Sequence, residues 1–327
     1  MRNHVTRREF GLGLAAAAAT AALPLRADAA VTFKYGTSAN ANTLTANFAS
    51  KVFGAVEKQT GGEVKTQIFA GTLGGEKTLV DAVSLGSLDL YSGAYTGTRE
   101  FDILYSPYMF RDGDHAGKLM RGALGERASK VLESRYKARL LGTGRLGPYV
   151  LALKKKISSL DELKGMKLRT PEIEGCLAAV RHLGANPTPV PFNEVYMALQ
   201  NGVVDGFVSA LNPSVGGKFH EVCKYVVANQ FGEALDKVMI SVRAWERLTP
   251  KQKEIMSSTL HSLEETDYYK AGQEAMKKDF ETWKAVNGPD SIITLDQQEL
   301  MKRMLPLNRK LADEVFGAGS WDLIQKT

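Results

Sequence analysis

Hydrophobic and polar positions change period several times along residues 31–91. Residues 31–35 alternate with period two, as in a half-buried strand, and Gly36 ends the run. Leu44, Phe48, Val52 and Val56 then recur at four-residue steps, as on one face of a helix. The pattern predicts strands over 31–35, 64–69 and 88–91, with one helix ending before Gly61 and another over 76–85. Strands alternating with short helices predict a mainly parallel sheet with helices on both faces.

The same rhythm returns after a region of loops and helices at residues 101–140. Apolar side chains at 192, 195, 196 and 199 fit one face of a helix over 192–200. The other expected elements are a short helix over 160–163, strands over 166–170 and 203–208, and a helix over 176–183. Two α/β units separated near residue 150 predict two lobes with a cleft between them.

A long helix is expected over residues 249–286. Thr249 and Pro250 suit the N-cap and first helical position, and Asn287-Gly288-Pro289 stops the pattern. At 1.5 Å per residue such a helix reaches about 55 Å, enough to run along both lobes.

The first 29 residues are typical of a twin-arginine export signal. Thr6-Arg7-Arg8-Glu9-Phe10 precedes an apolar run at 11–25, and Ala27-Asp28-Ala29 has a small-x-small cleavage pattern. The run has about 15 residues, whereas a membrane-spanning helix needs about 20. We expect removal of residues 1–29 and a mature protein in the periplasm.

Composition and charge exclude several classes of protein. The chain of 327 residues is 44% hydrophobic and 24% charged, as in soluble globular proteins of about two domains. Its formal charge of +6, with four arginines and two acids in the first 29 residues, is weak support for nucleic-acid binding. The two cysteines, Cys176 and Cys223, could form a disulfide or remain as buried thiols.

No cofactor or metal site is expected. The histidines after residue 29 have no metal-ligand spacing, and neither a phosphate-binding loop nor a GxSxG nucleophile elbow occurs. The most informative chemistry is Arg169, at the end of a short strand directly before Pro171. Ligands bind outside strand ends in open α/β sheets, and a guanidinium there can hold both oxygens of a carboxylate.

Several blocks in order resemble the periplasmic solute-binding proteins of TRAP transporters, in the branch that binds dicarboxylates and sugar acids. They are the turn at 71–76, Gly86-Ser-Leu-Asp89, Pro107-Tyr-Met-Phe110, the 159–171 and 183–206 blocks, Lys218-Phe-His-Glu-Val222 with Lys224-Tyr225, and Trp245 with Leu248-Thr-Pro250. The resemblance implies a two-lobed α/β clamp with a long helix crossing both lobes. It also implies capture of a small organic acid by hinge closure and delivery to an ion-gradient-driven TRAP permease in the membrane.

The resemblance also implies roles for individual residues. Arg169 matches the carboxylate-binding arginine of the family, and Phe192 an aromatic that packs on the ligand, with core packing as its alternative role. The family often has an acid and then an asparagine after Asp-Gly, where this chain has Val208 and Ser209. Ser209 and nearby Asn212 are therefore candidate contacts. The departure favours a sugar acid, hydroxy acid or other monocarboxylate over a four-carbon dicarboxylate.

The remaining candidate contacts come from three segments. A second cation is expected before the 159–171 block, with Arg145 favoured over the lysines at 154–156. Asn42 or Asn40 could present an amide to the ligand or cap the first helix. Glu76 could face the cleft or sit in the first turn of a helix, where the dipole favours an acid.

We expect residues 31–152 with about 235–274 to form one lobe, and 153–234 with about 275–327 the other. The function expected is a non-enzymatic receptor for a small carboxylate. The alternative is a periplasmic hydrolase or lyase on the same two-lobed scaffold, because a fold does not fix a function.

Overall fold

The computed structural model describes residues 30–95, 99–264 and 268–327. The predicted export signal lies outside these residues. Within them, no helix is both long and apolar enough to cross a membrane.

The strands form one continuous sheet that extends through both halves of the molecule. Its strand order is β2-β1-β3-β9-β4-β7-β5-β6, and two short strands, β8 and β10, lie beside this path. Pairs β1–β2, β1–β3, β5–β6 and β5–β7 are parallel, and β9 and β4 are antiparallel to their neighbours. The strands are β1 (Val31–Thr37), β2 (Val64–Ala70), β3 (Leu90–Ala94), β4 (Ala138–Leu153), β5 (Lys167–Thr170), β6 (Asn186–Pro189), β7 (Gly206–Ala210), β8 (Tyr225–Val227), β9 (Glu233–Ser241) and β10 (Ile292–Ile293).

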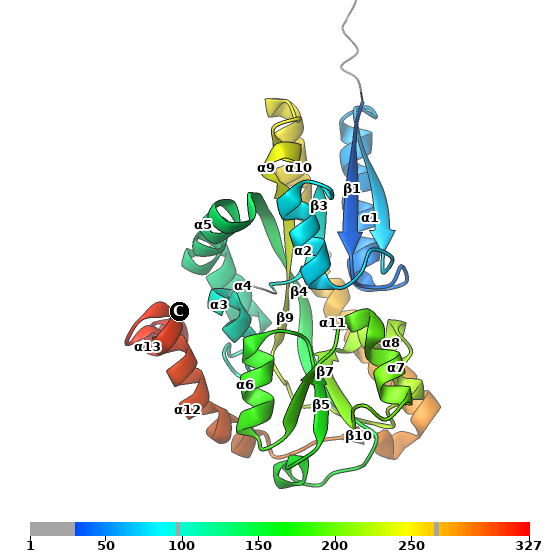
Figure 1. The fold of residues 1–327 in the computed structure, drawn as a ribbon, viewed down its shortest axis with the longest axis vertical. Coiled ribbons are helices and arrows are strands. Elements are labelled where there is room, and N and C mark those ends of the chain that lie inside the picture. Colours follow the sequence, from blue (N-terminus) through cyan, green and yellow to red (C-terminus); the bar gives the residue numbers. More distant parts are fainter. Residues whose placement is uncertain (1–29, 96–98, 265–267) are drawn as a thin grey trace, which may run out of the picture.

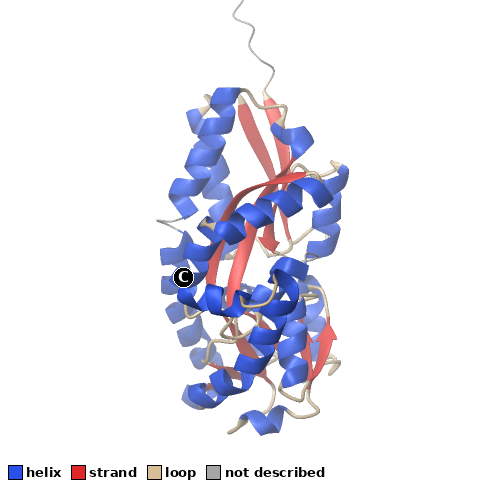
Figure 2. Cartoon of the chain, turned by 90° about the vertical axis from the view of Figure 1, so that its left-hand side faces the viewer, coloured by secondary structure: helices blue, strands red, loops and turns tan. Residues whose placement is uncertain are grey.

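Helices cover the sheet in both halves of the molecule (Figures 1 and 2). They are α1 (Leu44–Gln59), α2 (Glu76–Leu85), α3 (Arg99–Asp102), α4 (Gly113–Arg121), α5 (Ala123–Tyr136), α6 (Glu174–His182), α7 (Val195–Gln200), α8 (Leu211–Gly216), α9 (Val242–Trp245), α10 (Pro250–Leu263), α11 (Tyr269–Asn287), α12 (Gln297–Phe316) and α13 (Ser320–Lys326). Short 3-10 turns are η1 (Ile103–Tyr105), η2 (Leu160–Leu163), η3 (Phe192–Glu194), η4 (Phe219–Glu221) and η6 (Pro289–Ser291). The α/β alternation predicted from the hydrophobic pattern is confirmed.

Strands β4 and β9 join the two halves. Residues 138–148 of β4 pair with β9, whereas residues 149–153 pair with β7 and β8. In Figure 1, β4 and β9 run from the upper group of elements, with β1 and α1, to the lower group, with β5 and β7. We call these groups the upper and lower lobes.

The region predicted as a long helix contains two helices, α10 and α11. Thr249 caps α10 through its side chain, which accepts from Gln252 N, and Gln252 bonds back to Thr249 N. The π-helical residues Glu264 and Tyr268 flank residues 265–267, which are not described. Whether α10 and α11 form the single predicted helix depends on residues 265–267, which lie outside the described residues.

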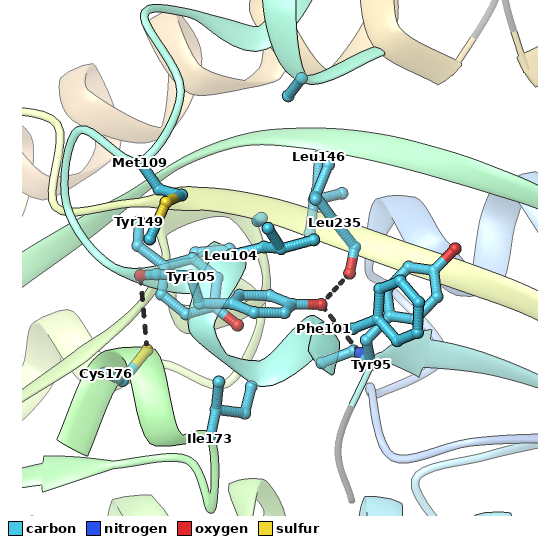
Figure 3. Close-up of a cluster of buried hydrophobic side chains, with 14 of the residues drawn as sticks. Tyr95, Phe101, Leu104, Tyr105, Met109, Leu146, Tyr149, Ile173, Cys176 and Leu235 are labelled. Atoms are coloured by element: carbon cyan, nitrogen blue, oxygen red, sulfur yellow. Dashed lines mark hydrogen bonds between the residues drawn. The ribbon is translucent and has the colours of Figure 1, made fainter. Parts of the chain in front are cut away.

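A buried cluster around Tyr105 connects η1 to both long strands and to α6 (Figure 3). The Tyr105 hydroxyl donates to the carbonyl of Leu235 on β9 and accepts from Tyr95 N at 2.8 Å. The Tyr105 and Tyr149 rings lie 5.6 Å apart, and Cys176 Sγ is 3.9 Å from the Tyr105 carbonyl. Cys176 and Cys223 are both buried free thiols.

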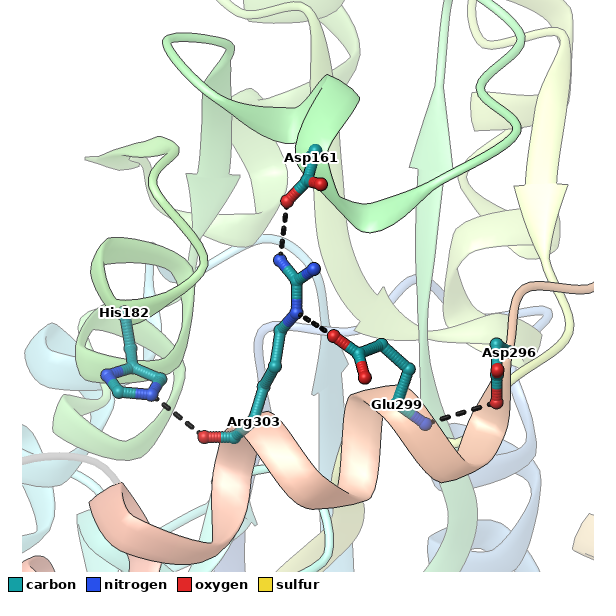
Figure 4. Close-up of polar contacts among 5 residues, drawn as sticks. All are labelled: Asp161, His182, Asp296, Glu299 and Arg303. Atoms are coloured by element: carbon teal, nitrogen blue, oxygen red, sulfur yellow. Dashed lines mark hydrogen bonds and ion pairs between the residues drawn. The ribbon is translucent and has the colours of Figure 1, made fainter.

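The C-terminal helices run along one side of the molecule and contact both lobes (Figure 1). Arg303 of α12 donates at 2.7 Å to both Asp161 and Glu299, and its carbonyl lies 2.8 Å from His182 Nε2 (Figure 4). At the other end, His115 Nε2 on α4 lies 2.8 Å from the carbonyl of Ile324. This C-terminal segment braces the molecule on the side of α4 and α6.

Candidate functional site

A small cavity lies where the two lobes meet beside β4 and β9. Its volume is about 50 Å³, and an adjoining pocket of about 360 Å³ shares Glu76, Arg169, Pro171 and Phe192 with it. The polar side chains that line the cavity are Thr37, Ser38, Thr45, Glu76, Tyr149, Arg169, Ser209 and Asp236. Both lobes contribute to this set, so closing or opening the lobes would assemble or separate it.

Arg169 supplies the positive charge of the cavity lining. It lies on β5 between Thr188 of β6 and Phe207 of β7, and only 3% of its surface is exposed. Its Nε donates to the Val190 carbonyl at 2.9 Å and its Nη1 to the Val208 carbonyl at 3.2 Å. Within the described residues no carboxylate forms an ion pair with it.

The electrostatics of Arg169 suit an anionic ligand. Burial lowers the pKa of its guanidinium to about 10, while nearby Tyr149 and Glu76 oppose that shift. The group is still cationic at neutral pH, and among the described residues its desolvation is offset by hydrogen bonds to neutral carbonyls and by the Tyr149 and Glu76 side chains, without an ion pair. A carboxylate entering the cavity would gain a charge-assisted hydrogen bond at low dielectric.

Phe192 begins η3 and lines both the cavity and the adjoining pocket. The Arg169 guanidinium carbon lies 5.9 Å from the centroid of its ring. The Phe192 ring also packs on Phe219, with centroids 5.3 Å apart. Phe192 therefore occupies both of the positions that were alternatives in the sequence, the cavity wall and the edge of the core.

Ser209 and Glu76 also reach the cavity. Ser209 lies on β7 opposite Val150 of β4 and is 6% exposed. Glu76 is the first residue of α2, lines the cavity, and accepts from Ser38 Oγ at 3.5 Å. Gly75 before it comes close to the lower lobe, because a Cβ there would lie 3.3 Å from Pro191 Cβ.

Arg145 does not line the cavity. Its Nη1 donates at 2.8 Å to both the Gly113 carbonyl and Asp114, and its guanidinium carbon lies 3.6 Å from the Tyr269 ring centroid. These contacts direct it toward α4 and α11, beside a different pocket. Of the alternative lysines, Lys154 donates to the Leu199 carbonyl, and none of the three lines the cavity.

Asn42 and Asn212 lie at a contact between the lobes next to the cavity. Asn212 Oδ1 accepts from Leu44 N at the start of α1, and its Nδ2 donates to Asp279 of α11, each at 3.0 Å. Asn42 Nδ2 lies 3.5 Å from the Gly216 carbonyl, and Thr43, not Asn42 or Asn40, caps α1. The Asn212 amide is thus engaged in linking α1, α8 and α11, a group we call the α1–α8 clasp.

Comparison with known proteins identifies the family to which the chain belongs. The model of the bacterial extracellular solute-binding protein family 7 matches residues 35–314. The chain belongs to this family. The resemblance inferred from the sequence blocks is confirmed, and the members are solute receptors, so the hydrolase or lyase alternative gains no support.

Individual family 7 relatives agree with this assignment. The sialic acid-binding periplasmic protein of Vibrio cholerae is 28% identical over 243 residues, which are 72% of this chain and 75% of that protein. A TRAP periplasmic solute-binding protein from Polaromonas, with bound D-erythronate, superposes with a TM-score of 0.83 and 25% identity, covering 90% of this chain and 98% of that one. A sugar acid-binding protein from Advenella mimigardefordensis, with galactonate, shares the fold at a TM-score of 0.84 and 20% identity, covering 91% and 99%.

Five polar cavity residues of this family 7 protein were not anticipated from the sequence, and two of them, Thr37 and Ser38, lie at the end of β1 and directly after it. Of the others, Asp236 comes from β9, Tyr149 from β4 and Thr45 from the first turn of α1. Asp236 and Tyr149 lie on strands that the hydrophobic pattern did not predict, because glycines at 142, 144 and 147 interrupt the period of β4. Two adjacent charged residues, Asp236 and Lys237, within the otherwise apolar run 234–240 were the available signal for Asp236.

Proposed function

We propose that this protein is a periplasmic receptor that binds a small organic acid in the cavity between its lobes. The observation that carries the proposal is Arg169, a buried cation without an ion-pair partner among the described side chains, at the wall of an interlobe cavity. A ligand carboxylate would supply the missing partner. Phe192 would pack on the ligand, and Ser209 and Glu76 would contact its polar groups.

Ligand binding would favour the closed arrangement of the lobes. We infer that β4 and β9 act as the hinge, since they run from one lobe to the other, and the lobe boundaries expected near residues 152 and 234 fall at the ends of these strands. A ligand that touches both lobes binds the closed state better than the open state and so shifts the population toward it. The α1–α8 clasp would stabilise the same state.

The receptor would hand its ligand to a TRAP permease and would not transform it. Relatives with this fold carry D-erythronate and galactonate in their structures, which are monocarboxylates with several hydroxyl groups. The single cavity arginine accords with a monocarboxylate. Among the described residues that line the cavity, no second cation is present to bind the other carboxylate of a dicarboxylate.

A thermal-shift screen tests the proposal. The mature protein would be screened against organic acids, sugar acids, amino acids and neutral sugars, because a ligand at 100 times its Kd stabilises by about 2.7 kcal/mol. We expect a series of carboxylates to raise the Tm and the Arg169→Ala variant to lose that response. Stabilisation by neutral sugars alone, or recovery of a chemically altered ligand, would contradict it.

A further inference from the structure

The cavity has an acidic side chain at a position remote in the sequence from the arginine. Asp236 lies on β9 between Ala94 of β3 and Gly144 of β4, and it lines the cavity together with Arg169. Gly144 is required here, because a Cβ at this position would clash with the ring of Tyr268, which lies against Asp236.

The hydrogen bonds to Asp236 leave one of its oxygens available. Thr45 Oγ1 donates to Oδ2 at 3.2 Å and Tyr268 OH donates to the same oxygen at 3.0 Å. In the part of the chain that the structure describes, Oδ1 accepts no hydrogen bond and the carboxylate forms no ion pair. An ionised carboxylate has about four acceptor positions, so half of its capacity is unused.

The surroundings make this unused capacity costly. Burial and, second to it, the nearby Glu76 charge together raise the pKa of Asp236 to about 6, against the hydrogen bonds from Tyr268 and Thr45. Asp236 is only partly exposed at the cavity wall, so an acceptor there without a protein donor is less well solvated than in bulk water. A donor on a bound molecule would remove that penalty.

Arg169 and Asp236 mark different ends of the cavity. Arg169 lies on β5 and Asp236 on β9, with β7 and β4 between these strands in the sheet, and the Glu76 charge shifts the pKa of both side chains. Glu76 is close enough to influence both ends. The two ends thus offer opposite chemistry, a cationic donor at Arg169 and an anionic acceptor at Asp236.

We propose that Asp236 accepts a hydrogen bond from a hydroxyl or ammonium group of the ligand, at the end away from the carboxylate held by Arg169. This inference rests on the proposed function and adds a requirement to it. The receptor selects carboxylates that carry a proton-donating group over those of similar length that carry none. Thr45 and Tyr268 act as positioning residues, because both bond to Oδ2 and leave Oδ1 without a donor among the described residues.

Calorimetry with three probes of similar length tests the inference. D-erythronate carries hydroxyl groups, 4-aminobutyrate carries an ammonium group, and butyrate carries neither. We expect the protein to bind erythronate or 4-aminobutyrate at least about tenfold more tightly than butyrate, the scale of one hydrogen bond to a charged group. The probe that binds more tightly identifies the donor as hydroxyl or ammonium.

Variants assign the preference to Asp236. Asp236→Ala should remove most of the tenfold preference and leave butyrate binding unchanged. Asp236→Asn, which keeps one acceptor oxygen, should retain part of the preference for erythronate. Glu233→Gln is the matched control, because Glu233 is a buried acid on the same strand that does not line the cavity. It should leave all three affinities unchanged.

The outcomes separate this inference from the proposed function. Arg169-dependent binding with the same preference in Asp236→Ala as in the parent protein overturns the inference alone. An equal loss of affinity for all three probes in Asp236→Ala, in a protein with an unchanged Tm, assigns Asp236 a structural role and also overturns it. Binding of none of the probes contradicts both proposals.

Discussion

Two buried arginines of this protein have opposite surroundings. Arg169 on β5 is 3% exposed and bonds only to backbone carbonyls among the described groups, whereas Arg145 on β4 is 9% exposed and is paired with Asp114 and stacked on Tyr269. Both lie near the junction of the lobes, Arg169 one residue before the end of β5 and Arg145 at a β-bulge in β4. Burial alone therefore does not distinguish the two arginines, and the missing acidic partner is the observation on which the proposed role of Arg169 rests.

Replacing Arg169 should have the largest effect on binding. In Arg169→Ala, a bound carboxylate would be left buried without its cation, which costs roughly 2–5 kcal/mol, or at least about 30-fold in affinity. Titration calorimetry with a carboxylate found in the screen measures this. An affinity within threefold of the parent would show that another group holds the carboxylate.

Replacing the arginine with lysine should have a smaller effect on the same site. Arg169→Lys keeps the charge but loses the planar guanidinium group that can donate two parallel hydrogen bonds. The binding free energy should therefore become less favourable by roughly 1–3 kcal/mol. Because the variant keeps a cation, its Kd compared with that of Arg169→Ala separates charge from geometry. Equal affinity of the lysine variant and the parent would rule out bidentate binding.

The matched change at the other arginine should affect folding and not binding. Arg145→Ala removes a buried hydrogen bond to Gly113 and the contact with Tyr269, while its ion pair counts for little because the Asp114 side chain is 81% exposed. We expect a loss of about 1–2 kcal/mol in the free energy of unfolding, measured in denaturant, with Kd unchanged. A large rise in Kd without loss of stability would make Arg145 a ligand contact after all.

The α1–α8 clasp should contribute less than either arginine. Asn212→Ala removes the bonds to Leu44 N and Asp279, which would destabilise the closed state by about 1 kcal/mol and weaken binding several-fold. Stopped-flow experiments should show the change mainly in the dissociation rate. Small-angle scattering of the ligand-free variant should show a larger radius of gyration than that of the ligand-free parent. If neither the radius of gyration nor the dissociation rate changes, the clasp does not contribute to closure of the lobes.

The last prediction concerns the pH dependence of stability, not ligand binding, and involves the acid beside Arg145. Burial raises the pKa of Glu233 to about 8, and the Arg145 charge only partly opposes this. The folded state thus holds a proton that the unfolded state releases near pH 4.5, so this group stabilises the fold at low pH and loses its contribution as pH rises toward 8. The stability difference between Glu233→Gln and the parent should therefore grow in favour of the variant over that range. A pH-independent difference would contradict the raised pKa.

The sequence was sufficient to predict the elements with a clear period. The helix and strand positions at 31–85 agree with the structure within a few residues, since four-residue steps and alternation survive wherever one face is buried. Strands β4 and β9 were not predicted. They are buried on both faces or broken by glycines and bulges, so neither period is visible, and their antiparallel pairing depends on contacts distant in the sequence.

The candidate site was predictable to the extent that local pattern marks it. A strand-end arginine before a proline pointed to Arg169, and Phe192, Ser209 and Glu76 also reach the cavity. Asn212, Asn42 and Arg145 are of suitable chemical type, but tertiary hydrogen bonds engage them elsewhere. Asp236 was not chosen from the sequence, because its place in the cavity depends on the packing of β9 beside β4 and α1, which lies beyond the local pattern.

The role of Arg169 as the carboxylate-binding group is tested most directly by a comparison of the best-binding acid with its neutral alcohol, in the parent protein and in Arg169→Ala. We predict that the parent binds the acid at least about 30-fold more tightly than the alcohol and that the variant binds the two with similar affinity. The same preference for the acid in both proteins would contradict the assignment.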